Sequence, residues 1–150
     1  MQVYGFSDKG SVRPTNEDYF GYFIPTEAKV KDKRGSLFAV SDGVGGSASG
    51  EVASAEAVNA HPNRNVLLKA IGEGPLLLPD FYSGQVKPGD LFCLITDGIL
   101  EHATDEDLKA FLLEKRPSQE RLSQWIAELN RRGGYDNMTI LTVKVNQVPC

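Results

Sequence analysis

Residues 36–43 read SLFAVSDG and residues 91–98 read LFCLITDG, and these two stretches decide the expected fold. Each is a short apolar run of strand length that ends in Asp-Gly, a dipeptide typical of turns. Working outward, the segments QVYGFS and DYFGYFI and the alternating, β-branched stretch Asn137–Val145 also have the pattern of strands. The chain is therefore expected to contain several short strands separated by turns.

A hairpin is expected around the second of these stretches. Phe81–Val86 and Asp90–Thr96 have the composition of strands, and the turn KPGD joins them. Earlier in the chain, the Ala-rich stretch Glu51–Ala60 predicts a short helix that ends before Pro62.

Two amphipathic helices are expected between the hairpin and the last strand. Thr104 begins the capping box TDED ahead of the first helix. Ser118 precedes the second, SQERLSQWIAELNRR, which stops at Gly133 and Gly134 and places Trp125 on its apolar face. These elements predict an α+β fold that forms one domain over residues 1–150.

Composition narrows the classes of function. The chain has 150 residues, 41% of them apolar, and its 16 basic and 20 acidic residues give a net charge of −4. The Lys and Arg residues do not cluster into a basic stripe that could bind a phosphate backbone, so nucleic acid is not an expected partner. No apolar run approaches the roughly 20 residues that span a bilayer, and the N-terminus lacks a signal-peptide pattern. A cytoplasmic protein with no membrane partner is therefore expected. The two cysteines match neither a disulfide framework nor a zinc knuckle.

Four acidic residues share one local setting, the junction between an apolar strand and a turn: Asp18, Asp42, Asp97 and Asp136. Strand ends place side chains at the rim of a sheet, and carboxylates gathered on one rim repel one another unless a cation neutralises them. Because all the candidate ligands are oxygen atoms, Mg²⁺ or Mn²⁺ is preferred over zinc. The pattern predicts a metal site.

Two other interpretations of these segments are open. Asp-Gly and Asp-Asn are common turn dipeptides for backbone reasons alone, which would account for any one of the four positions without a ligand. The stretch SDGVGGSASG also looks like a phosphate-binding loop, but it lacks the Gly-Lys-Ser/Thr ending of a P-loop. Only the joint pattern favours metal.

The joint pattern resembles the PP2C (PPM) family of metal-dependent protein phosphatases. Four blocks follow the order of that family's motifs: SDKGSVRPTNEDYF, LFAVSDGVGGSASGEVAS, GDLFCLITDGILEHATDEDL and GGYDNMTILTV. The resemblance implies a PP2C-like β-sandwich flanked by helices, two Mg²⁺ or Mn²⁺ ions per site, and hydrolysis of phosphoserine or phosphothreonine by a metal-activated water.

The resemblance also implies a role for each site residue. Arg13 would hold the substrate phosphate, since a guanidinium suits two phosphate oxygens at once. Asp42 would bridge the two ions, and the carbonyl of Gly43 would assist it. The remaining metal positions would be Glu17, which holds a metal-bound water, and the aspartates Asp18, Asp97 and Asp136, with Asn137 as a supporting polar group. Val44 stands where some members carry a proton-donating histidine, which favours a bacterial-type member.

One part of the family pattern is missing from this chain. Ala60 is followed directly by His61, where the family has further segments. These are the Gly-Thr-Thr strand, the Val-Gly-Asp-Ser-Arg strand and the flap with its third-metal aspartate, and nothing in this chain resembles them. A sandwich reduced in strand number is therefore expected. It would be a compact minimal form, a homodimer whose chains complete each other's sheets, or a sequence joined across a gap.

The missing part leaves alternative functions open. The leading hypothesis is a phosphatase acting on a phosphorylated protein substrate and opposing a serine/threonine kinase. A catalytically impaired pseudophosphatase or phosphoprotein-binding module is the first alternative, and a structural assembly subunit is the second. Retention of Arg13 together with all four aspartates argues against the second alternative.

Overall fold

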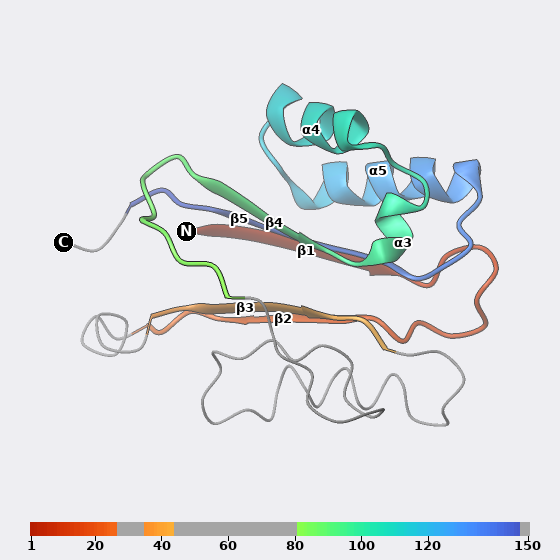
Figure 1. Ribbon diagram of the computed structural model, residues 1–150, viewed down its shortest axis with the longest axis horizontal. Helices are drawn as coiled ribbons and strands as arrows, with labels where there is room; N and C mark the ends of the chain where they lie inside the picture. Colours follow the sequence, from red (N-terminus) through yellow and green to blue (C-terminus); the bar gives the residue numbers. More distant parts are fainter. Residues whose placement is uncertain (27–34, 44–80, 148–150) are drawn as a thin grey trace.

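The computed structural model describes residues 1–26, 35–43 and 81–147 of the chain. Along this part of the sequence the strands and helices follow the order β1 (Gln2–Asp8), β2 (Tyr19–Phe23), β3 (Leu37–Ser41), β4 (Leu91–Ile95), α3 (Asp97–Leu100), α4 (Asp105–Glu114), α5 (Gln119–Arg132) and β5 (Met138–Lys144). The five strands form two sheets, and the helices lie on one side of the larger sheet (Figure 1).

The larger sheet has three antiparallel strands in the order β1, β5, β4. Its central strand, β5, pairs along its whole length with β1, from Gln2 opposite Lys144 to Asp8 opposite Met138. The first six of the seven residues of β5 are buried, because this strand has a neighbour on each edge and a layer on each face. The β-branched, apolar sequence of β5 suits this position.

The smaller sheet consists of β2 and β3, paired antiparallel with Tyr19 opposite Ser41. Residues of β2 and β3 contact β5, so the two sheets pack face to face. Gly5 of β1 makes this approach possible, because a Cβ there would collide with the ring of Phe20. The two sheets form a small sandwich, with α4 and α5 beyond the three-stranded sheet (Figure 1).

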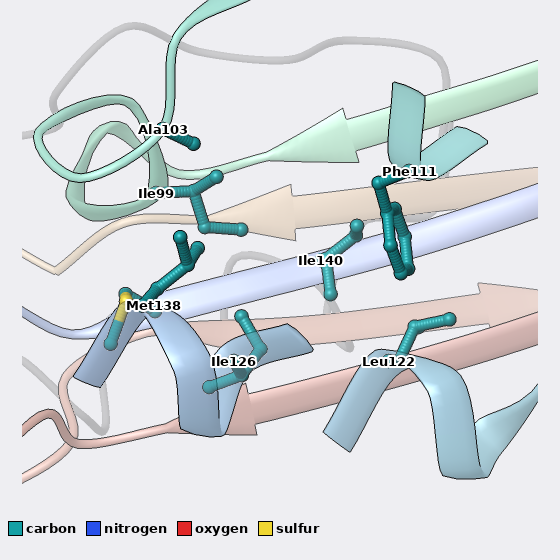
Figure 2. Close-up of a cluster of buried hydrophobic side chains, with 8 residues drawn as sticks. Ile99, Ala103, Phe111, Leu122, Ile126, Met138 and Ile140 are labelled. Atoms are coloured by element: carbon teal, nitrogen blue, oxygen red, sulfur yellow. The ribbon is translucent and has the colours of Figure 1, made fainter. Parts of the chain in front are cut away.

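The core lies between the three-stranded sheet and the helices. Ile99, Leu122, Ile126, Leu129, Met138 and Ile140 are each no more than 1% exposed and pack together with Ala103 and Phe111 (Figure 2). Burying an aliphatic side chain of this size contributes about 1.5–3 kcal/mol. Trp125 stacks on Phe111 with ring centroids 4.2 Å apart, which confirms its predicted place at the core.

Both predicted helices begin where their caps were expected. The Thr104 hydroxyl accepts a hydrogen bond from the Asp107 backbone N–H, and the Asp107 carboxylate accepts one from the Thr104 backbone N–H, which completes a capping box. The Ser118 hydroxyl accepts from the Arg121 N–H at the start of α5. After α5, Gly134 has a φ of 59°, a left-handed conformation that glycine adopts without strain.

Most predicted strands are confirmed, but the predicted hairpin is wrong. Residues 81–86 form no strand, and Phe81 and Tyr82 are 75% and 94% exposed, so this run has aromatic composition without a sheet partner. The turn at Lys87–Asp90 does form, but Gly89 N–H donates to the Val145 carbonyl and Val145 N–H donates to the Asp90 carbonyl. The turn is therefore attached to Val145, the residue that directly follows β5, and β4 pairs with β5 instead of with residues 81–86.

The short helix α3 was missed by the sequence analysis, which ended the strand at Thr96 and expected a turn. The predicted helix Glu51–Ala60 and the junction at Ala60 and His61 lie outside the described residues. Within the described ranges, no helix is long and apolar enough to cross a membrane.

Candidate active site

The four predicted aspartates lie at one end of the two sheets. Asp18 directly precedes β2 and Asp42 directly follows β3, and the antiparallel pairing puts the start of β2 beside the end of β3. Asp97 follows β4 and Asp136 precedes β5, and these two strands are likewise antiparallel. The same end carries α3 and the loop between β1 and β2 (Figure 1). We call these four residues the acidic rim.

The carboxylates of the acidic rim are close enough to change one another's protonation. The pKa of Asp42 is raised from 3.8 to about 7, first by partial burial and then by the negative charges of Asp18 and Asp97 and a hydrogen bond with Asp97. The charge of Asp136 adds to the same shift. Asp42 and Asp97 each keep a large exposed surface, so repulsion among the rim carboxylates contributes to the raised pKa of Asp42 together with its partial burial.

Asp18 is the most deeply placed member of the acidic rim, with 7% of its surface exposed. Burial raises its pKa, because a charged carboxylate loses hydration there. Hydrogen bonds from Thr96 and Thr139 oppose that shift, and the Thr96 hydroxyl donates to Asp18 Oδ2 at 2.8 Å. The protein thus offsets part of the cost of a buried negative charge.

Arg13 lies at the open side of the acidic rim. Its Nη2 donates to Asp136 Oδ2 at 2.7 Å, and the two side chains are 45% and 27% exposed. The hydrogen bond and charge of Asp136 raise the pKa of Arg13, and the charges of Glu17 and Glu101 add to this effect. The guanidinium is thus held at the rim by a charge-assisted hydrogen bond.

The loop between β1 and β2, which carries Arg13 and Glu17, is held by Asn137. The Asn137 side-chain amide donates to the carbonyls of Lys9 and Thr15, both at 2.9 Å, and its Oδ1 accepts from the Glu17 N–H at 2.8 Å. Asn137 is only 6% exposed. The supporting role predicted for this residue is therefore a backbone clasp on the loop.

The Asp-Gly dipeptide at the end of β4 is needed for packing. Asp97 begins α3, and a Cβ on Gly98 would collide with the Asn137 carbonyl. A Cβ on Gly10 would likewise collide with the Asp136 carbonyl, and Gly10 has a φ of 79°. These glycines let the two loops approach the rim closely. A role in a turn alone does not account for the contact at Gly98.

The donor set of the acidic rim fits a hard divalent cation, since it consists of carboxylate oxygens with no thiol or imidazole among them. Within the described residues, however, no three His, Cys, Asp or Glu side chains are placed so that they could hold one metal ion. The two carboxylate oxygens of Asp136 are engaged by Arg13 and by the Asn137 N–H, and one oxygen of Asp18 is engaged by Thr96. The ligand roles of Glu17, Asp18, Asp42, Gly43, Asp97 and Asp136 stay predictions.

Sequence reasoning missed the hydroxyl and amide groups behind Asp18, which belong to Thr96, Thr139, Ser7 and Asn16. Thr96 and Thr139 stand beside the motif aspartates in LITDG and DNMTI, but threonine is common in strands and gave no separate signal. His102, which was not assigned to catalysis, accepts a hydrogen bond from the Tyr135 N–H.

Comparison with known proteins shows what this chain is similar to. No family model matches the chain. It is 31% identical over 98 residues to the serine/threonine phosphatase Stp of Listeria innocua, and the match covers 65% of this chain and 38% of that protein. It is 26% identical over 92 residues to the protein phosphatase PhpP of Streptococcus pneumoniae, covering 61% of this chain and 37% of that protein.

Solved structures agree with the sequence matches. The serine/threonine phosphatase of S. agalactiae superimposes with a TM-score of 0.76 at 16% identity, over 96% of this chain and 99% of the other. The Mycobacterium tuberculosis phosphatase PstP/Ppp gives a TM-score of 0.71 at 17% identity, over 97% and 99% of the two chains.

The fold is therefore that of the PPM phosphatases, an α+β sandwich reduced in strand number, as the sequence predicted. By sequence and fold, the chain is similar to PP2C-type serine/threonine phosphatases. The aligned part of the chain spans less than two fifths of the length of the curated relatives that it matches.

Proposed function

We propose that this chain is a metal-dependent protein serine/threonine phosphatase that hydrolyses phosphoserine and phosphothreonine, and that residues 1–150 form a single minimal phosphatase domain. The observation that carries the proposal is the acidic rim itself. Four carboxylates from the ends of four strands lie next to an arginine, and partial burial together with the neighbouring negative charges raises the pKa of Asp42 to about 7. Such an arrangement costs stability unless a cation and an anion occupy it.

In this proposal, one set of residues binds the metal ions and another residue binds the substrate phosphate. The acidic rim, Glu17 and the Gly43 carbonyl are proposed to hold two Mg²⁺ or Mn²⁺ ions, with Asp42 shared between them. When bound, these ions would supply a water of lowered pKa and neutralise charge on the phosphoryl group. Arg13 has donors in a planar fork and is proposed to bind two phosphate oxygens, which orients the ester.

Asn137 and Thr96 hold the backbone and the carboxylate that this chemistry depends on. Asn137 fixes the loop between β1 and β2, which carries Arg13 and Glu17 at the rim. Thr96 holds Asp18 at the bottom of the rim. No protein nucleophile is needed in this scheme.

The substrate class follows from the family resemblance and from the exposed position of Arg13. A phosphorylated side chain on a partner protein can reach a guanidinium that is 45% exposed at the rim. We propose that the phosphoprotein is the product of a serine/threonine kinase. A cytoplasmic location fits this role and stays a prediction from the sequence.

A homodimer that completes the sheets is a further part of the proposal. Among the described strands, β4 is hydrogen-bonded to β5 only, and we propose that its other edge pairs with a second copy of the chain. Light scattering coupled to size-exclusion chromatography would give twice the monomer mass if chains pair there, and the monomer mass of 16.4 kDa would reject the dimer.

The test of the proposed activity is Mn²⁺-dependent hydrolysis of p-nitrophenyl phosphate and of a phosphothreonine peptide by the wild-type chain. Asp42→Asn is expected to lower kcat by at least on the order of 100-fold, the scale for losing one charge-stabilising group. Arg13→Ala is expected to lower kcat/KM by about 10- to 100-fold, because phosphate binding is lost while the rim carboxylates remain. Asp105→Asn, at an exposed position in the first turn of α4, is the matched control.

Calorimetric titration with Mn²⁺ completes the test. Turnover that requires Mn²⁺ and disappears in Asp42→Asn supports the phosphatase. Mn²⁺ binding without turnover on either substrate would reject it in favour of a pseudophosphatase. An activity that Asp42→Asn and Asp105→Asn change equally would show that the acidic rim is not the active site.

A further inference from the structure

Thr96 occupies the point where the larger sheet meets the acidic rim. It follows the last residue of β4 and is only 4% exposed. Its backbone N–H donates to the Thr139 carbonyl at 3.1 Å, and its hydroxyl oxygen accepts from the Thr139 N–H at 2.9 Å. The side chain therefore satisfies a buried donor of the central strand where β4 ends.

The hydroxyl of Thr96 has one proton, and the structure fixes where it points. One side of the oxygen is taken by the Thr139 N–H, and the proton is donated to Asp18 Oδ2 at 2.8 Å. A β-branched side chain has few χ1 conformations, and two buried hydrogen bonds select one of them. Asp18 thus meets a donor whose direction is set by β5.

A second line of polar groups approaches Asp18 through Thr139. The Asn16 amide donates to Ser7 Oγ at 2.8 Å, and the hydroxyls of Ser7 and Thr139 lie 2.7 Å apart. An amide N–H₂ can only donate, so Ser7 is free to donate its own proton to Thr139 and Thr139 to donate to Asp18. A hydrogen bond from Thr139 lowers the pKa of Asp18, which agrees with this direction.

This setting separates Asp18 from the other rim carboxylates. Asp42 and Asp97 are exposed, and Asp136 accepts hydrogen bonds from the exposed Arg13 and from the Asn137 N–H. Asp18 is the buried member, and the two threonines that hold it belong to the central strand of the larger sheet and to the end of its neighbour β4. Asp18 is therefore oriented by side chains of the larger sheet, whereas Asp136 is held by the exposed Arg13 and by the backbone N–H of the next residue, Asn137.

We propose that Thr96 is a positioning residue for Asp18. Its hydrogen bond orients the Asp18 carboxylate, so that this metal ligand is already in place when the ion binds. The inference rests on the proposed function, because it presumes that Asp18 binds a cation. Its physical basis is that hydrogen bonds to a ligating carboxylate reduce the reorganisation needed to bind the metal.

The experiment compares Mn²⁺ affinity, measured by isothermal titration calorimetry, among wild type, Thr96→Val, Thr96→Ser and Thr142→Val. Valine keeps the shape of threonine but removes the donor, so Thr96→Val is expected to weaken Mn²⁺ binding by about 10- to 100-fold. Serine keeps the hydroxyl, so Thr96→Ser is expected to stay within about 3-fold of wild type.

Thr142→Val is the matched control for the loss of a buried hydroxyl. Thr142 is 1% exposed, belongs to the same central strand, and donates to the Tyr4 carbonyl at 3.2 Å, away from the acidic rim. Thermal melts on each variant show how much stability each substitution costs. A weakened Mn²⁺ affinity in Thr96→Val alone, at a melting temperature similar to that of Thr142→Val, supports positioning.

Two outcomes overturn the inference in distinguishable ways. Equal Mn²⁺ affinities of wild type and Thr96→Val, or equal losses in both valine variants, would reduce Thr96 to a structural residue and leave the proposed function intact. A wild-type chain that binds no Mn²⁺ and turns over no phosphoester would overturn the proposed function together with this inference.

Discussion

The helix-covered core and the acidic rim follow opposite rules of stability. In the core, Ile126 and Leu129 of α5 are no more than 1% exposed and pack against apolar neighbours. At the rim, partial burial and the negative charges of Asp18 and Asp97 raise the pKa of Asp42 to about 7, which disfavours the folded state at neutral pH. The core stabilises the fold, and this stability offsets the cost of placing several carboxylates close together at the rim.

The joint between the two regions is polar and buried. Asn137 and Thr139 belong to the same short segment, which leaves the rim and enters the centre of the larger sheet, and both are at most 6% exposed. Asn137 holds the loop between β1 and β2, and Thr139 holds Thr96, which donates to a carboxylate of the rim. Because the two regions differ in this way, substitutions in the core, at the joint and at the rim should affect stability and activity to different degrees.

The largest expected effect is in the core. Ile126→Ala removes a side chain that is 1% exposed and leaves a cavity beneath β5, so we expect a loss of about 2–5 kcal/mol in the free energy of unfolding. Urea denaturation measures it. Leu113→Ala, at a residue that is 71% exposed, is the control and should change stability by less than about 0.5 kcal/mol. Similar urea midpoints for the two variants would show that the core is not where stability resides.

The second-largest effect is expected at the joint between the core and the acidic rim. Asn137→Ala leaves the Glu17 N–H and the carbonyls of Lys9 and Thr15 without their partner. Each unsatisfied buried group costs about 1–3 kcal/mol, and water that reaches the loop recovers part of this, so we expect a loss of about 2–3 kcal/mol. Unlike the loss in Ile126→Ala, this one should come with a lower kcat/KM for p-nitrophenyl phosphate, because the loop carries Arg13.

The control for the joint is Asn146→Ala, at an exposed position beyond β5. It should leave both the urea midpoint and kcat/KM near those of wild type. An Asn137→Ala variant that loses stability but keeps full kcat/KM in the folded fraction would show that the clasp supports the fold alone.

The sequence predicted those parts of the fold that local chemistry decides. The capping box at Thr104 and the stop of α5 at Gly133 depend on neighbouring residues, and both are confirmed. The strand predicted at Phe81–Val86 is wrong, because composition cannot show whether a strand has a partner, and residues 81–86 have none among the described strands.

The site likewise has a part that the sequence predicted and a part that it did not. The sequence predicted that Asp18, Asp42, Asp97 and Asp136 would share one rim, because each stands at a strand end, and the fold brings these ends together. The links from Thr96 and Thr139 to Asp18 were not predictable, because they join residues 78 or more positions apart. Such partners are known only once strand order and register are known.

The smallest effect concerns the pH dependence of stability without metal. The pKa of Asp42 is about 7 in the folded chain, against its ordinary value of 3.8 when unfolded, so between these values the folded state binds more protons than the unfolded state. Stability then falls as pH rises through this window. In EDTA, the urea midpoint of wild type should be higher near about pH 5 than near about pH 7.5.

Substitution of Asp42 tests whether the acidic rim causes this slope. Asp42→Asn removes the group and one of the mutually repelling charges, so its midpoint should change less between the two pH values and exceed that of wild type at the higher one. Asp107, whose pKa is lowered mainly by its hydrogen bonds with Thr104 and Arg132, loses its contribution only below its ordinary value of 3.8 and leaves this window unaffected. Asp105→Asn should keep the wild-type slope. Equal slopes in Asp42→Asn and Asp105→Asn would mean that the carboxylates of the rim do not repel one another in the folded chain, and the contrast between core and rim would lose its electrostatic basis.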